Sequence, residues 1–105
     1  MIIYPNQRII TIKKNATTEN KLDYETTMNT ARDLKPTTFL VWIYLNGYEN
    51  DCEFALSRVD VMEQTGISSS SYDSAIKKLK EKGYLVHTTD NRYDFYAVPA
   101  GGNEL

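Results

Sequence analysis

"TGISSSSYDSAIKKLKEKGYLV", from Thr65 to Val86, holds two glycines that frame a run of serines and a helical pattern. Within it, apolar residues recur at helical spacing, at Tyr72, Ala75, Ile76 and Leu79. Gly66 is suited to end a preceding helix and Gly83 to end this one, because glycine adopts the left-handed conformation without strain. Ser68 is suited to cap the helix between them, since its hydroxyl can accept from free backbone N–H groups. The stretch therefore predicts two consecutive helices joined by a short turn.

The segment just before this stretch predicts the first of the two helices. Ser57 is suited to cap it, and Leu56 stands at the spacing of a hydrophobic staple from Val61. Val59 and Met62 extend the predicted apolar face. We therefore expect this helix to start after the serine and to end at the glycine turn.

Three further segments carry strand signals. Residues 84–98, "YLVHTTDNRYDFYAV", predict a β-hairpin, because two tyrosine- and valine-rich runs flank Asp90 and Asn91, which favour tight turns. "EFALS", residues 53–57, predicts a short strand. Residues 9–12 predict another, since three isoleucines and a threonine are all β-branched.

Two more helices are expected in the first half of the chain. Asp23 can cap a helix whose apolar positions follow helical spacing, at Tyr24, Met28, Ala31 and Leu34. "PTTFLVWIYLNG", residues 36–47, contains seven consecutive apolar residues, which suit either a buried strand or a buried helix. Pro36 as a first-turn residue and Gly47 as a stop favour the helix.

The composition describes one small domain of 105 residues with a net charge of −2. No apolar run is long enough to span a membrane and no secretory signal is visible, so we expect a cytoplasmic protein. The single cysteine, Cys52, fits a reducing compartment. Charge is uneven: residues 1–21 and 66–92 are net positive, whereas residues 22–65 are net negative.

No motif indicates an enzyme. The single histidine, His87, and the single cysteine lack evident catalytic partners. The sequence shows no glycine-rich phosphate loop, no paired-carboxylate motif and no metal-ligand spacing. We therefore expect no enzymatic activity, no cofactor and no metal.

The order of helix, short strand, helix, glycine turn, helix and hairpin resembles the winged helix-turn-helix DNA-binding family. The residues that carry the resemblance are "LSRVDVMEQTGISSSSYDSAIKKLKEKGYLV" and the following "NRYDFYAV", within residues 34–98. The chain is similar to small phage and plasmid proteins of Gram-positive bacteria, among them replication initiators and replisome organisers. It departs from the family at Lys35, where the first helix often begins with a serine cap. The resemblance implies an α+β fold with a three-helix core, a hairpin wing, and here an extra N-terminal strand and helix.

The resemblance also implies binding to double-stranded DNA, with the third helix in the major groove and the wing on the backbone. The implied contacts are Ser69, Ser70, Ser71, Asp73, Ser74, Lys77, Lys78 and Arg92, with Lys13 and Lys14 as further candidates. Serine hydroxyls and free N–H groups at a helix start can donate to phosphates. The alternatives are a solvated helix start for the serines and complementation of the helix dipole for the lysines. A different function is protein contact through the acidic region 49–63.

Three parts of the chain are predicted: an N-terminal extension (1–33), a winged-helix domain (34–98) and a flexible tail (99–105). The strand in the extension would leave an open edge unless it pairs. We therefore expect the extension to form a homodimer contact, since regulators of this size pair two copies on a symmetric site. The alternative is that the strand folds back onto its own wing sheet.

Overall fold

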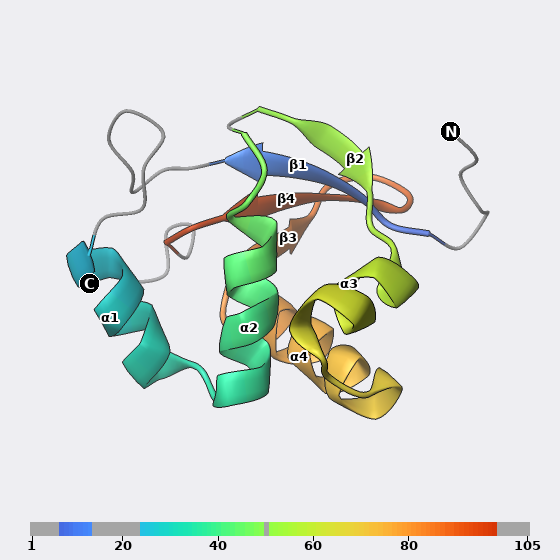
Figure 1. Ribbon diagram of the computed structural model, residues 1–105. Helices are drawn as coiled ribbons and strands as arrows, with labels where there is room; N and C mark the ends of the chain where they lie inside the picture. The colour runs from blue at the N-terminus through green and yellow to red at the C-terminus, as the bar shows by residue number, and fades with distance from the viewer. Residues whose placement is uncertain (1–6, 14–23, 50, 99–105) are drawn as a thin grey trace.

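A sheet covered on one face by helices organises the fold (Figure 1). The computed structural model describes residues 7–13, 24–49 and 51–98. Within them the elements are β1 (Ile9–Lys13), α1 (Tyr24–Asp33), α2 (Pro36–Leu45), β2 (Glu53–Ala55), α3 (Arg58–Thr65), α4 (Ser69–Glu81), β3 (Leu85–His87) and β4 (Arg92–Tyr96). The predicted α+β class is confirmed, and no helix in these ranges is long and apolar enough to cross a membrane.

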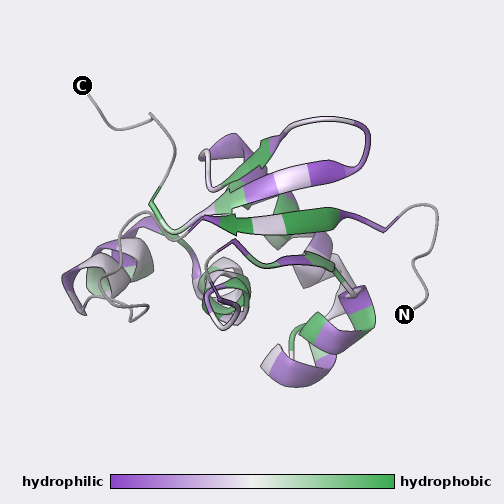
Figure 2. Ribbon diagram, turned by 90° about the horizontal axis from the view of Figure 1, so that it is seen from above, coloured by the Kyte–Doolittle hydropathy of each residue, from purple (hydrophilic) through white to green (hydrophobic). Residues whose placement is uncertain are grey.

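The sheet has the strand order β2-β1-β4-β3, so β1 lies in its interior. β1 pairs antiparallel with β2, where Ile9 faces Ala55, and parallel with β4, where Ile12 faces Phe95. Viewed from above, β1 is largely hydrophobic and no helix of the described chain lies over the outer face (Figure 2). The alternative, that this strand folds back onto its own wing sheet, is what the structure shows, because both edges of β1 are paired within its own chain. A homodimer stays a prediction.

The core lies between the sheet and α2, which runs beneath it (Figure 1). The ambiguous segment 36–47 contains the helix α2, which spans Pro36–Leu45 and has Pro36 in its first turn, as the proline predicted. Its inward side chains are Val41, Trp42 and Leu45, all fully buried. The indole Nε1 of Trp42 donates to the Ala97 carbonyl at 3.2 Å, which ties α2 to the end of the hairpin.

The helices α3 and α4, and the turn between them, form where the predicted caps and glycine stops place them. The Ser57 hydroxyl accepts from the Asp60 N–H at 3.1 Å, and Gly66 ends α3 in the left-handed region with φ of 80°. Ser68 caps α4, and Gly83 follows that helix with φ of 87°. These local signals place α4 against α3 and join it to the β3–β4 hairpin.

The apolar faces of α1 and α3 differ from the prediction. Tyr24 is 77% exposed and Met28 also reaches solvent, whereas Thr30 and the Leu34 that follows α1 are buried. Val59 is 62% exposed while Val61 is buried. Residues two apart on a helix point about 200° apart, so both valines cannot face the core. The proposed Asp23 cap lies outside the described residues.

Candidate nucleic-acid interface

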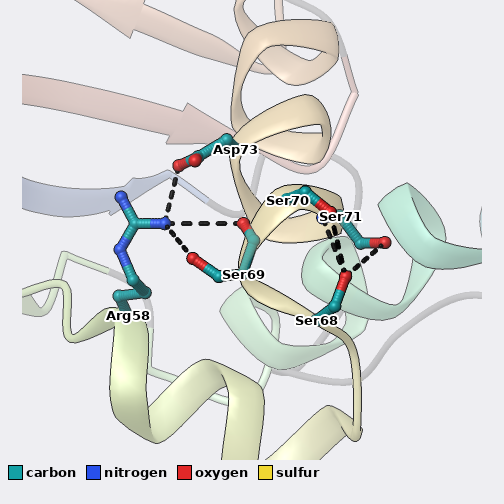
Figure 3. Close-up of polar contacts among 6 residues, drawn as sticks. All are labelled: Arg58, Ser68, Ser69, Ser70, Ser71 and Asp73. Atoms are coloured by element: carbon teal, nitrogen blue, oxygen red, sulfur yellow. Dashed lines mark hydrogen bonds and ion pairs between the residues drawn. The ribbon is translucent and has the colours of Figure 1, made fainter.

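The four serines form the start of α4 (Figure 3). The Ser68 hydroxyl accepts from the Ser71 N–H at 3.2 Å, which is the predicted cap. The same oxygen lies 3.1 Å from the Ser71 hydroxyl and 3.2 Å from the Ser70 hydroxyl. This cluster satisfies one of the free N–H groups of the first turn and leaves Ser69 and Ser70 exposed.

The buried side chains of α4 show which of its residues point outward. Tyr72, Ala75, Ile76 and Leu79 are buried, so the opposite side of the helix carries Ser70, Ser74 and Lys77, all exposed. Ser69 and Asp73 lie on the flank toward α3, as their contacts with Arg58 show. Ser71 and Lys78 lie on the other flank and are half-buried. The helix residues that the resemblance implied therefore form one outward face and its two flanks.

Arg58, the first residue of α3, was missed by the sequence analysis. Its Nη1 atom lies 2.7 Å from the Asp73 carboxylate and 3.1 Å from the Ser69 hydroxyl (Figure 3). The guanidinium also lies 4.7 Å from the centre of the Tyr72 ring, a cation–π contact. Asp73 is thus neutralised by an ion pair. The available signal was that Arg58 is the only basic residue between positions 36 and 76.

Two more cations on the same flank were also missed. The guanidinium of Arg8, just before β1, lies 5.9 Å from the centre of the Tyr93 ring, and Lys80 Nζ of α4 lies 5.6 Å from it. Burial raises the pKa of the Tyr72 hydroxyl, and the charges of Arg8 and Arg58 act against that rise. Arg8, Arg58 and Lys80 therefore line the side of α4 that faces the sheet. We call these three residues the cationic flank.

Arg92 does not join this surface. It begins β4 and stands three residues from the buried Phe95, so alternation places it on the outer face of the sheet, away from the helices. There its guanidinium pairs with Glu53 of β2, across the intervening β1. A DNA contact of Arg92, which the resemblance placed on the wing, stays a prediction. Lys13 pairs with Asp51 at 3.7 Å, and Lys14 lies outside the described residues.

Two lysines near the end of α4 have structural partners. Lys78 lies 3.4 Å from Glu81 on the same helix. Lys82 lies 2.9 Å from Asp33 of α1, and the Tyr84 hydroxyl donates to the same carboxylate at 2.8 Å. The hydrogen bond from Lys82 lowers the pKa of Asp33, more than its burial raises it. The lysine that remains on the outward face without an ion pair to any described residue is Lys77.

No metal site competes with this surface in the described chain. No group of three histidine, cysteine, aspartate or glutamate side chains is placed to hold a metal there. Comparison with protein-family models, curated proteins and solved structures found no match to this chain. Its function must therefore be inferred from the surface of α4 and its surroundings.

Proposed function

We propose that this protein binds double-stranded DNA through α4 and serves a mobile element, in transcriptional control or replication initiation. The order of α2, β2, α3, α4 and the β3–β4 hairpin supports a winged helix-turn-helix interpretation. In it, α3 and α4 are the two-helix motif, α4 enters the major groove, and the hairpin is the wing. β1 is an addition that separates β2 from the hairpin.

The observation that carries the proposal is the outward face of α4. It presents the short side chains of Ser70 and Ser74 beside the exposed Lys77. Short hydroxyl side chains let a helix approach base edges closely, and a lysine can reach a guanine or a phosphate. Along one side of this face runs the cationic flank. The result is a narrow, locally positive surface on a chain whose net charge is −2.

The test is binding of the full-length protein to a labelled duplex of random sequence, measured by fluorescence anisotropy over a salt series. Contacts to about four to six phosphates would give a slope of log K against log salt of about −4 to −5. A flat response, or no binding by protein on the order of micromolar at about 50 mM salt, contradicts the proposal. Selection of bound duplexes from a random pool then measures sequence specificity.

Substitutions on the outward face locate the contact. Lys77→Ala and Ser70→Ala should each weaken binding to the selected site by about 1–3 kcal/mol if the side chain contacts a base. Arg32→Ala is the control for Lys77→Ala, because it removes one positive charge from the exposed face of α1. Unchanged affinity in both α4 variants would mean that this helix does not enter the groove.

Protein contact is the second candidate function, and a groove between α2 and α3 favours it. Leu40 and Ile43 are 39% and 38% exposed beside this opening of about 450 Å³, with Tyr48 and Asp60 also in its lining. A groove lined by apolar side chains and one carboxylate suits a basic segment that also carries apolar side chains.

Most carboxylates of the acidic region 49–63 already have a partner within the chain. Asp51 and Glu53 are ion-paired with Lys13 and Arg92, and Asp60 accepts a hydrogen bond from Tyr44. Exposed Glu49 and Glu63 remain as the acidic side chains of this region for a basic partner. Duplex binding with the expected salt slope would favour the first function.

A further inference from the structure

An open pocket of about 330 Å³ lies where the segment before β1 meets α3 and α4. Arg8, Arg58 and Tyr72 line it, together with Ser57 and Gln7. We propose that this pocket binds a phosphodiester group of the nucleic-acid backbone between the two guanidinium groups. The choice of a DNA phosphate as ligand rests on the proposed function, whereas the anion site itself rests on the pocket and its arginines. Neither arginine was among the residues that the sequence pointed to.

Arg58 retains donors for such a ligand. Among the described residues, its polar partners are Asp73 and the hydroxyl and carbonyl of Ser69, and all of them contact Nη1. Figure 3 shows the other two guanidinium nitrogens pointing away from α4. A guanidinium carries five N–H donors in a planar fork that matches a phosphate. The contacts with Asp73 and Tyr72 thus fix the orientation of the fork while leaving part of it available.

Arg8 approaches the same pocket from the other side. Its carbonyl accepts from the Leu56 N–H at 2.8 Å, which fixes the backbone next to the first residue of β1. Its guanidinium lies 5.9 Å from the centre of the Tyr93 ring, a cation–π contact. The Arg58 guanidinium is held by Asp73, Ser69 and Tyr72 before a ligand arrives, so less of its side-chain entropy is lost on binding.

The charge balance selects an anion. Two arginines line the pocket, and no carboxylate is among its described lining residues; Asp73, outside the lining, pairs with Arg58 and offsets one of the two charges. The pocket opens beside the exposed start of α4, so a duplex on the outward face of that helix would bring its backbone to this flank. Phosphate contacts of this kind fix the position of a protein on DNA without selecting a sequence. β1 would then have two roles, as an interior strand of the sheet and as the support of a phosphate contact.

The same chemistry suits a free phosphate, so the experiment has two arms. In the first, Arg8→Gln and Arg58→Gln are compared with wild type in the duplex salt series. Each should reduce the magnitude of the slope by about one and weaken binding to all sequences alike. Arg32→Gln on α1 loses the same charge and should change neither quantity. Arg58→Gln/Asp73→Asn keeps the wild-type net charge, so a reduced slope in that variant reports the lost contact itself.

The second arm follows the arginine side-chain Nε–H signals by NMR during titration of the wild type with inorganic phosphate. Signals of Arg8 and Arg58 should shift, and sodium chloride at equal ionic strength should not reproduce the shift. Duplex binding with unchanged slopes in both single variants would overturn this inference and leave the proposed function standing. Phosphate shifts without any duplex binding would overturn the function and keep the anion site. Absence of both effects would overturn both.

Discussion

Ile12→Ala should strongly destabilise the protein, because β1 is an interior strand. Ile12 is fully buried, with β2 on one side of its strand and β4 on the other. Truncation of a buried isoleucine costs about 2–5 kcal/mol, through lost burial and the cavity that remains. Domains of this size are stable by about 5–15 kcal/mol, so the single variant should fold with a clearly lowered urea midpoint.

The same reasoning extends to larger changes in the strand. Ile10 lies on the same buried face, so Ile10→Ala/Ile12→Ala should cost about 4–10 kcal/mol, with some coupling between the neighbours. That loss approaches the whole free energy of unfolding. A chain of residues 33–105 lacks β1, the strand that joins β2 to the hairpin in the sheet. This shortened chain should show no cooperative unfolding.

Fluorescence of Trp42, the only tryptophan and fully buried, reports these transitions. Thr11→Ala is the matched control, because Thr11 belongs to the same strand but points to the outer face, and its loss should cost less than about 1 kcal/mol. A change below about 1 kcal/mol in Ile12→Ala would refute the interior position of β1. So would cooperative unfolding of residues 33–105 at the midpoint of the full chain, which would leave the strand available to a second copy.

Three further changes probe single positions. Gly66→Ala should lower the free energy of unfolding in urea by about 1 kcal/mol, because alanine is strained at φ of 80°. The loss should be no larger, because the added Cβ meets no atom within 4 Å. Asp33→Asn should lower stability at neutral pH by less than about 1 kcal/mol, since the pair with Lys82 is partly exposed. Folding lowers the pKa of Asp33, so the stability that its carboxylate contributes is present above about pH 4 and is lost as the pH falls through the folded pKa. The urea midpoints of the wild type and Asp33→Asn should therefore converge in acid. Arg92→Ala should leave duplex affinity unchanged in the anisotropy assay, because Arg92 pairs with Glu53 on the far side of the sheet.

Local signals in the sequence were sufficient for the helix pair and the hairpin. Caps and stops act within a few residues, so Ser57, Gly66, Ser68 and Gly83 could be assigned from their neighbours alone. The outward face of α4 followed from helical periodicity in the same way. These elements were predictable because each is stabilised by contacts inside one short segment.

Pairings between distant segments could not be decided from the sequence. The β-branched residues 9–12 indicated a strand, but nothing in them identifies β2 and β4 as its neighbours or parallel pairing with β4. The contact between Arg58 and Asp73 joins two helices, and the approach of Arg8 depends on the position of β1 in the sheet. The cationic flank was missed for this reason, since its members are neighbours only in the folded chain.

The net charge of −2 is a poor guide to the surface that DNA would meet, because most carboxylates near α4 are already paired. Asp73 pairs with Arg58 and Glu81 with Lys78, and these are the two acidic residues of that helix. The opposite charges of a close pair largely cancel at distances well beyond their separation, and salt screens what remains, with a Debye length of about 10 Å at 0.1 M. The charges left on α4 are those of Lys77 and Lys80, which form no ion pair with any described residue. An approaching polyanion would therefore meet a positive helix on an acidic protein, and the acidic remainder would disfavour its binding elsewhere on the molecule.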